Sequence, residues 1–293
     1  MLKAYNEQDG TWTGEPAKRE ITIRDLLTHT SGLGYGAIDA DPRMRKIYAK
    51  AGIVEAFTTE PVTLAENIKK LAKLPLHHNP GEKFTYSMGL DVLGYLIEIV
   101  SGMPFDAFLK NHLFDPLGMK DTGFYLPADH AGRLVAVQKP ENGKWVRTTG
   151  SFFDPDYPIK GAKTLFSGGG GLCSTARDYA TFLQMYLNGG ELGGVRILSR
   201  TTVQTILGQQ VAGELFGGLD SYYGLAFGVV TDRGQTRGGS GSAGTFSWGG
   251  YFNTQYFADP KEGLIGILMK QTDGATEETG WKFPQLVGQV VDD

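Results

Sequence analysis

Apolar residues recur at helical spacing through the first half of the chain and predict a mainly helical region there. The run over 88–100 is apolar on almost every face, which predicts a central helix. Thr63 and Glu66 have the spacing of a capping box. Residues 1–20 are polar and aperiodic, so we expect a loop there. The predicted helices cover 21–29, 44–51, 63–72, 88–100 and 104–114.

Beyond residue 165 two helical patterns are followed by runs in which apolar and polar residues alternate. A capped start at Ser174-Thr175 and a shorter pattern over 200–207 predict two helices. The alternating runs that follow predict an antiparallel meander, and they cover 223–230, 244–250, 252–258 and 264–270. A terminal helix is expected to pack on that sheet, with one face formed by Phe283, Leu286, Val287 and Val290.

This order of elements predicts an α+β fold. A loop over 1–20 precedes a mainly helical region over 21–165, in which 120–165 is irregular and has no predicted topology. A sheet-containing region with the terminal helix covers 166–293. We interpret these parts as one composite fold and expect a site between helices and sheet, because pockets favour such junctions.

Charge and length exclude several classes of partner. The formal net charge is -4 and the longest basic run is Lys69-Lys70, so neither nucleic-acid nor membrane-surface binding is predicted. The longest apolar stretches are too short to span a bilayer. The N-terminus has no apolar leader, so a cytoplasmic location is expected if this start is native, and the compartment is otherwise unknown.

Motifs for metals and cofactors are absent from the sequence. It contains no G-x-S-x-G, Walker loop, H-E-x-x-H or C-x-x-C, and its five histidines lack ligand spacing. The glycines at 168–171 are not followed by Lys and Ser or Thr, so a close-packing turn is predicted rather than a phosphate loop. The single cysteine, Cys173, allows no intramolecular disulfide. We therefore predict no metal site and no cofactor.

Chemistry is expected at Phe84–Ser87, where an extended run meets the helix over 88–100. A helix N-terminus has unpaired N–H groups and a dipole that favours negative charge, and this one carries the hydroxyls of Tyr86 and Ser87. Together with the turn at His29–Gly32 and the strand start at Trp248–Tyr251, this corner resembles the serine β-lactamase and penicillin-binding superfamily, in particular its class C β-lactamase-like hydrolases and esterases. The segments that carry the resemblance are 21–34, 84–102, 116–123, 168–182 and 248–259.

The resemblance implies an antiparallel sheet flanked by helices and a set of catalytic roles. The family's nucleophile is the serine of an S-x-x-K helix start, with the lysine and the tyrosine of a Y-x-N segment as proton-transfer partners. Tyr86 matches that tyrosine. Trp248, Gly249 and Gly250 match the family's K-T-G strand, and Tyr251 would supply an oxyanion-hole N–H.

Two departures bear on the substrate. Met88 stands where the family has the asparagine of Y-x-N, and Trp248 stands where lactam-handling members have a lysine. The loss of an amide and a cation favours neutral esters over anionic lactams. Lys163-Thr164 does not restore the strand motif, because Leu165 follows where a glycine is required.

The third departure concerns the nucleophile. No serine in the chain has a lysine three residues on, and the nearest pattern ends in Arg177, which stays protonated and cannot act as a base. The family places S-x-x-K well upstream of the 21–34 segment. We therefore expect this chain to be the C-terminal majority of a longer protein, without the nucleophile and the N-terminal part of the sheet region, and inactive alone.

Several interpretations remain open at this stage. The parent activity is predicted to be hydrolysis of a small-molecule ester, with amide or lactam hydrolysis, a β-lactamase or a D-amino-acid peptidase as alternatives. The chain is otherwise a non-catalytic ligand-binding remnant, or a separate polypeptide completes it. An unpaired sheet edge would favour self-association.

The singled-out side chains also have structural interpretations. Tyr86 is a proton-transfer residue or a helix-start hydrogen-bonding group. Ser87 is predicted to be the helix N-cap and His29 a satisfied turn residue. Trp248 lines an acyl pocket or simply packs on the sheet.

Overall fold

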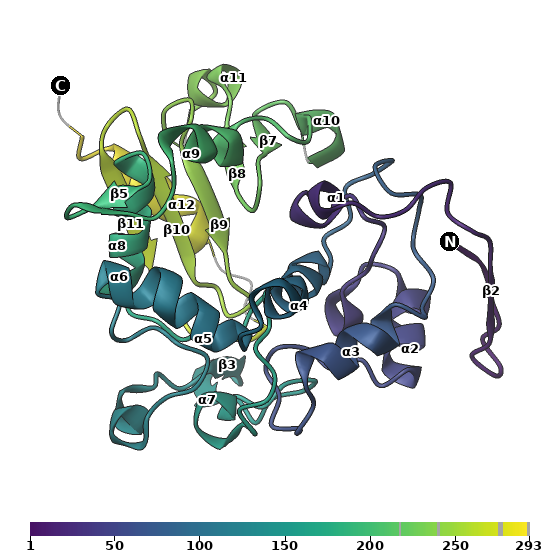
Figure 1. Ribbon diagram of the computed structural model, residues 1–293. Helices are drawn as coiled ribbons and strands as arrows, with labels where there is room; N and C mark the ends of the chain where they lie inside the picture. The colour runs from purple at the N-terminus through teal and green to yellow at the C-terminus, as the bar shows by residue number, and fades with distance from the viewer. Residues whose placement is uncertain (217, 239–240, 275–277, 292–293) are drawn as a thin grey trace. The chain divides into compact units, whose positions relative to one another are not determined.

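The computed structural model describes residues 1–216, 218–238, 241–274 and 278–291 and shows two compact units (Figure 1). The first unit comprises Met1–Phe108, Phe124–Ala128 and Gly150–Leu172. The second comprises Leu109–Gly123, Asp129–Thr149 and Cys173–Asp293. Each unit is described below by itself.

The first unit begins with a hairpin where a loop was predicted over residues 1–20. Strands β1 (Leu2–Tyr5) and β2 (Trp12–Gly14) pair antiparallel, and Gly10 closes the turn at a φ of 67°. These strands are short and mostly exposed, so they carry no alternating apolar pattern. The prediction of a loop is therefore wrong.

Local capping explains where the helices of the first unit start. Thr22 with Asp25, and Thr63 with Glu66, form the capping boxes of α1 and α3. Asp41 caps α2 by accepting the N–H of Arg43. The elements are α1 (Ile23–Leu27), η1 (Gly36–Ile38), α2 (Pro42–Lys50), α3 (Leu64–Leu71), α4 (Gly89–Ser101), α5 (Phe105–Leu109) and α7 (Tyr157–Lys160).

Helix α4 is buried at its start rather than along its length. Met88, Gly89 and Asp91 are buried, whereas Ile99 is 60% and Val100 is 74% exposed. The predicted helix is therefore confirmed, but its last turn lies at the surface rather than in a central position. Across the described residues no single helix is long and apolar enough to cross a membrane, and α4 with the following Phe105–Leu117 passes that test only as a pair bent by 81°.

The second unit is built on a five-stranded antiparallel sheet in the order β11-β10-β9-β8-β7. The predicted meander is confirmed, but the run over 223–230 is a hairpin rather than one strand. Ala226, at a φ of 75°, lies in the turn between β7 and β8. The sheet strands are β7 (Ser221–Tyr223), β8 (Gly228–Val230), β9 (Phe246–Gly249), β10 (Gln255–Asp259) and β11 (Leu264–Leu268).

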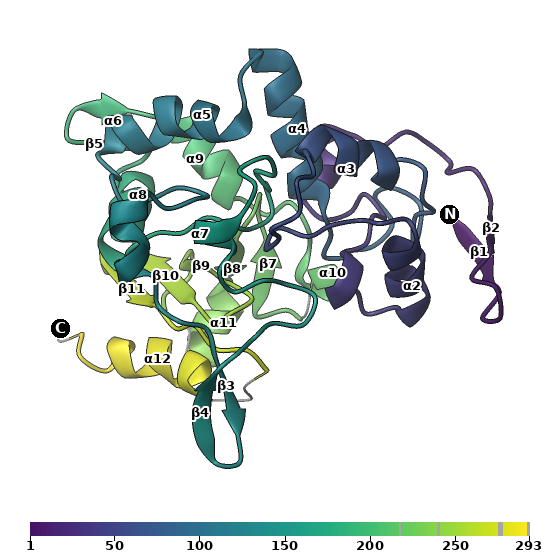
Figure 2. The ribbon, with the colours of Figure 1, turned by 90° about the horizontal axis from the view of Figure 1, so that it is seen from below.

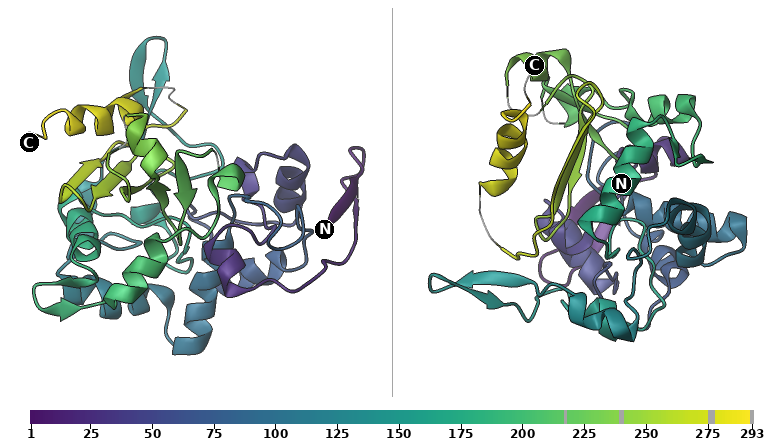
Figure 3. Two further views of the ribbon diagram at one scale, coloured as in Figure 1. Left: turned by 90° about the horizontal axis from the view of Figure 1, so that it is seen from above. Right: turned by 90° about the vertical axis from the view of Figure 1, so that its left-hand side faces the viewer.

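Helices cover the two faces of this sheet. Tyr179 of α8 packs on Tyr256 with ring centroids 4.8 Å apart, and Phe283 of α12 packs on Phe257 at 6.1 Å. Because neighbouring residues of a strand point to opposite faces, α8 and α12 lie on opposite sides, as the right-hand view of Figure 3 shows for α12. The predicted apolar face of α12 is only partly confirmed, since Leu286 is 60% and Val290 is 76% exposed.

The remaining elements of the second unit are short, except for α8, α9 and α12. The hairpin β3–β4 extends away from the sheet (Figure 2). These elements are η2 (Lys110–Phe114, a π-helical turn), α6 (Asp115–Leu117), η3 (Ala128–Arg133), β3 (Gln138–Glu141), β4 (Lys144–Arg147), α8 (Ala176–Leu187), β5 (Glu191–Leu192), β6 (Val195–Arg196), α9 (Arg200–Leu207), α10 (Gly213–Phe216), α11 (Asp232–Thr236) and α12 (Thr279–Gly288).

Candidate active site

Tyr86 lies on a segment that is fixed on both sides by backbone hydrogen bonds. The N–H of Thr85 donates to the carbonyl of His29 at 2.7 Å, and the N–H of Met88 donates to the carbonyl of Gly34 at 3.0 Å. The side chain of Tyr86 itself is 36% exposed. The fold therefore presents this phenol to solvent from a backbone that cannot shift easily.

Two aromatic rings hold the phenol of Tyr86 in place. The imidazole of His29 packs on it with centroids 4.6 Å apart, and the ring of Tyr35 stacks on it at 5.2 Å and an interplanar angle of 13°. Stacked aromatic pairs of this kind contribute about 0.5–1.5 kcal/mol beyond their area burial. Sequence analysis did not single out Tyr35, because it is separated from Tyr86 by 51 positions in the printed sequence and no local pattern marks it.

His29 and Ser87 form a buried pair behind Tyr86. The Nδ1 atom of His29 accepts the backbone N–H of Ser87 at 3.2 Å and lies 3.1 Å from its Oγ. Burial lowers the pKa of His29 to about 4, so the ring is neutral at pH 7. With Nδ1 as an acceptor, the ring proton sits on Nε2 and the hydroxyl of Ser87 donates to Nδ1.

This geometry corrects the prediction for Ser87, and it places His29 in the predicted turn with hydrogen bonds at its Nδ1 atom. The N-cap of α4 is Met88, whose side chain makes no capping hydrogen bond, while the Oγ of Ser87 accepts the N–H of Gly89 at 3.3 Å. Ser87 is therefore one position before the cap. Since Ser87 is 0% and His29 1% exposed, neither can reach a substrate in this structure.

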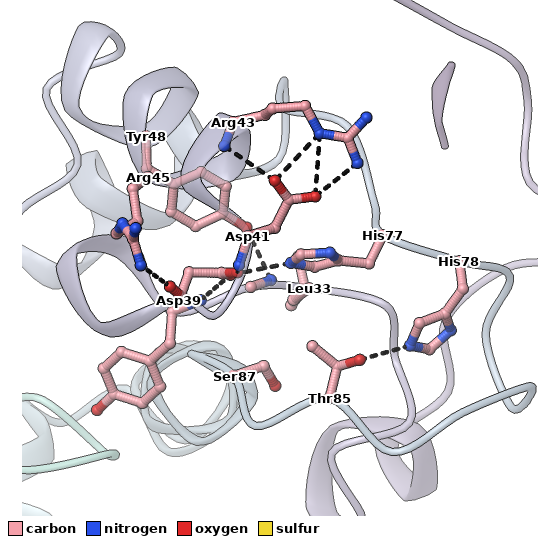
Figure 4. Close-up of polar contacts among 12 residues, drawn as sticks. Leu33, Asp39, Asp41, Arg43, Arg45, Tyr48, His77, His78, Thr85 and Ser87 are labelled. Carbon is pink, nitrogen blue, oxygen red and sulfur yellow. Dashed lines mark hydrogen bonds and ion pairs between the residues drawn. The ribbon is translucent and has the colours of Figure 1, made fainter. Parts of the chain in front are cut away.

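Carboxylates fix the backbone around Tyr35. Asp39 accepts the N–H of Tyr35 at 3.0 Å. It also bonds the Nε2 of His77 at 2.9 Å (Figure 4). Burial raises the pKa of Asp39, but the hydrogen bonds from His77 and the backbone outweigh it, so the net shift is downward and the group is ionised. On the other side, Glu55 accepts the N–H of Ala37 at 2.6 Å.

The adjacent histidines His77 and His78 point to different partners, as expected from the sequence. The Nδ1 atom of His78 donates to the carbonyl of Asn79, which leaves its Nε2 to accept the hydroxyl of Thr85 at 2.9 Å (Figure 4). Burial lowers the pKa of His78, which favours this neutral form. His78 therefore holds the segment before Tyr86, while His77 supports the turn that carries Tyr35.

A buried carboxyl on the first turn of α4 binds the glycine-rich segment. Asp91 is 3% exposed, and its Oδ1 accepts the hydroxyl of Ser167. Burial raises the pKa of Asp91 to about 6, although hydrogen bonds from Ser167 and the backbone lower it. The Oγ of Ser167 in turn accepts the N–H groups of Gly169 and Gly170 at 3.2 and 3.1 Å.

The glycine-rich segment is a close-packing turn, as predicted. A Cβ at Gly168 would lie 2.0 Å from the carbonyl oxygen of Leu90, and one at Gly169 would lie 2.7 Å from the Oδ2 of Asp91. Only glycine allows the backbone to approach α4 so closely. The start of α4 is therefore covered by backbone rather than by side chains.

The other predicted residues lie at the end of β9 in the second unit. Trp248 pairs with Tyr256, and its ring contacts Phe216 at 6.0 Å and Tyr223 at 5.2 Å. Gly250 donates to the carbonyl of Thr254 at 2.8 Å, in the turn that leads to β10.

Tyr251 lies in the same turn and is 40% exposed. Gly249 is the last residue of β9 and pairs with Gln255. Since Tyr86 belongs to the first unit, its partnership with Trp248, Gly249, Gly250 and Tyr251 stays a prediction.

The charged groups also bear on metal binding. Within the described ranges, no three His, Cys, Asp or Glu side chains come together in a way that could hold a metal ion.

Comparison with known proteins identifies the family. The family model described as Beta-lactamase matches residues 8–288. The chain belongs to the beta-lactamase family. Its β-lactamase/transpeptidase-like fold, with helices and an antiparallel sheet, is thereby confirmed.

Several relatives of this beta-lactamase family chain are named as esterases or hydrolases. Esterase EstB of Burkholderia gladioli is 31% identical over 271 residues, which cover 86% of this chain and 65% of that protein. The solved structure of EstCE1, described as a hydrolase with promiscuous acyltransferase activity, superposes with a TM-score of 0.77 and 25% identity over 92% of this chain and 71% of that one.

Protein Rv1367c of Mycobacterium tuberculosis is 35% identical over 268 residues, or 87% of this chain. The chain spans 63% of the length of that relative.

We expect Gly168→Ala to destabilise the protein, because the new methyl group would collide with the backbone of Leu90. Overpacking of this kind costs about 1–3 kcal/mol, measured as the free energy of unfolding in urea. Gly170→Ala is the matched control, because its methyl group would lie 3.4 Å or more from side-chain atoms only. Equal losses in both variants would contradict the close approach.

We expect Asp91→Asn to stabilise the protein at pH 8 but not at pH 4. A pKa of about 6 in the folded state, against about 4 in the unfolded state, means that folding binds a proton between these values. The contribution of Asp91 to the free energy of unfolding is therefore fully present below pH 4. It is lost as the pH rises through 6, and the loss amounts to about 2–3 kcal/mol. Urea unfolding at both pH values checks this, and a variant less stable than the parent protein at pH 8 would contradict it.

Proposed function

We propose that the protein serves ester hydrolysis through an acyl-serine intermediate, with Tyr86 as its proton-transfer residue. The observation that supports this most is the phenol of Tyr86, exposed at its edge and held between the rings of His29 and Tyr35 at the start of α4. A reacting group must be held in a narrow range of geometries to be effective. The names of the related esterases support the choice of an ester as substrate.

The proposed chemistry moves one proton in each direction. Tyr86 must first be ionised, a form that the lysine of the S-x-x-K segment is proposed to favour. As the serine oxygen attacks the ester carbonyl, the serine proton passes to this phenolate oxygen. When the tetrahedral intermediate collapses, that proton passes to the leaving alcohol and an acyl-serine remains. Water then attacks the acyl group and gives its proton to the Tyr86 oxygen. That proton passes to the serine oxygen as the acid is released.

The substrate is proposed to be a small neutral ester. Trp248, where lactam-handling relatives have a lysine, contributes an aromatic surface shared with Phe216 and Tyr223 instead of a cation for a carboxylate. The backbone N–H of Tyr251, in the turn after β9, is proposed as an oxyanion donor. Gly249 and Gly250, which precede it, are proposed to line the same site.

We also propose that the acylating serine and its lysine lie outside these 293 residues, since no serine of the sequence has a lysine three positions on. A tyrosine without a cationic neighbour has a pKa of about 10 and is a weak base at neutral pH. The 293-residue chain alone would then be inactive. Either a longer form of the protein or a second polypeptide would supply the missing groups, and an incomplete chain could self-associate instead.

An extended version of the protein that carries an S-x-x-K segment is expected to release p-nitrophenol from p-nitrophenyl acetate with an initial burst. Tyr86→Phe should lower kcat by about 10²–10⁴-fold, the usual contribution of general acid–base catalysis. Tyr95→Phe, which removes a hydroxyl from α4 itself, is the control and should retain activity. Absence of a burst in the parent extended protein would contradict the proposed function.

The 293-residue chain is expected to remain unlabelled by a fluorophosphonate probe, because its buried Ser87 cannot be reached and its proposed nucleophile is absent. Mass spectrometry of the treated protein measures this. Labelling of any serine would disprove the proposal that the nucleophile lies elsewhere. If the chain instead binds a neutral ester with no turnover even in extended form, the alternative of a non-catalytic binding protein is supported.

A further inference from the structure

Asp91 has a second carboxyl oxygen that the first hydrogen bond does not use. Its Oδ1 bonds Ser167, whereas its Oδ2 is buried and accepts no hydrogen bond from any residue that the structure describes. A buried carboxyl oxygen without a donor costs free energy. Such a group is a candidate for a functional role, because structural stability alone does not favour it.

The free oxygen faces Tyr35 across Gly169. A Cβ placed on Gly169 would lie 2.7 Å from the Oδ2 of Asp91 and 2.8 Å from the hydroxyl oxygen of Tyr35. Any side chain at residue 169 would therefore occupy the space between these two oxygens. Glycine at this position keeps them facing each other.

Tyr35 is in turn a neighbour of Tyr86. Its ring stacks on that of Tyr86, and its backbone is held by Asp39. Burial, followed by the charges of Asp91, Tyr86 and Glu55, raises the pKa of Tyr35 well above its usual value of about 10. Of the two stacked phenols, Tyr35 is thus kept neutral.

We propose that Asp91 is a positioning residue for Tyr86. Through Ser167 it fixes the glycine-rich segment against the start of α4, and Gly169 of that segment packs against both the Oδ2 of Asp91 and the hydroxyl oxygen of Tyr35, whose ring stacks on Tyr86. The positioning is a property of this chain alone, while its effect on catalysis rests on the proposed function of Tyr86.

The groups around Asp91 define what a pH titration would report. The titratable groups that face it are Tyr35 from the turn before η1 and Glu55 from the loop after α2, and the polar groups are Ser167 and the N–H of Gly169. No lysine or arginine forms an ion pair with Asp91 in the described part of the chain. Asp91 and Glu55 are thus two of the groups that can change charge near Tyr35 at acidic pH. The others are Asp39, which accepts the N–H of Tyr35, and His77, which is bonded to Asp39.

The test uses ¹⁹F NMR of the 293-residue protein labelled with 3-fluorotyrosine. The signals of Tyr35 and Tyr86 are assigned from the variants Tyr35→Phe and Tyr86→Phe. We expect the Tyr35 signal of the parent protein to shift in one step near pH 6, where Asp91 titrates. Asp91→Asn should abolish the step. Glu55→Gln, the matched carboxyl control, and His77→Gln, which removes the imidazole bonded to Asp39, should both retain it, and loss of the step in His77→Gln would overturn the proposal.

Orientation is tested by the same spectra at pH 8. Asp91→Ala, which removes both carboxyl contacts, should move the Tyr86 signal, whereas the isosteric Asp91→Asn should leave it near its position in the parent protein. A step that survives in Asp91→Asn, or that disappears in Glu55→Gln, would overturn the proposal. An unchanged Tyr86 signal in Asp91→Ala would do the same.

Two features keep this test decisive. Asp91→Asn keeps the size and shape of the side chain, so its titration can be measured even if Asp91→Ala does not fold. The measurement contains no ester, so a negative esterase assay leaves it valid. A failed titration, conversely, leaves the Tyr86→Phe assay of the proposed function untouched.

Discussion

The tight contact at the start of α4 is the constraint on which the first unit depends. A Cβ on Gly89 would lie 2.8 Å from the carbonyl oxygen of Leu26, and one on Gly168 would lie 2.0 Å from that of Leu90. Backbone thus packs on backbone on two sides of one helical turn. Because protein interiors are close-packed and respond to the addition of a single methyl group, this arrangement leaves Tyr86, immediately before the turn, little freedom to move.

Buried charge lies on the same turn. Asp91 stays in the core although burial raises its pKa to about 6, and at neutral pH it remains largely ionised without a cationic partner among the described residues. Replacement of such a group by a neutral isostere is expected to stabilise the protein. Functional sites often contain groups of this kind, which lower the stability of the fold.

Local signals in the sequence were sufficient for much of the fold. The capping box at Thr63 needs only residues three positions apart, and the meander needs only alternation and turns. The hairpin of β1 and β2 could not be predicted, because its strands are short and exposed and Leu2 is tied instead to the distant Leu76.

The same distinction applies to the candidate site. Tyr86 was found because a helix start and a family motif coincide there. Tyr35, Asp91 and Ser167 were not, because their relation to Tyr86 depends on side chains and on a glycine that meet only in the folded chain. A signal was present, however: Asp91 is an acidic residue in an otherwise apolar run over 88–97, and burial of such a residue calls for an explanation.

The pair of His29 and Ser87 shows why contact geometry alone does not assign a nucleophile. A serine hydroxyl within hydrogen-bond reach of an imidazole has the spacing that activated serines require. Here, however, both groups are inaccessible, and the imidazole is the acceptor of a backbone N–H with a pKa lowered to about 4. A base that weak, already engaged by the backbone, cannot take up a proton at neutral pH. The pair instead fixes the segment that carries Tyr86. The phenol of Tyr86 is exposed to solvent and packed against two aromatic rings, which are the properties that the proposed proton transfer needs.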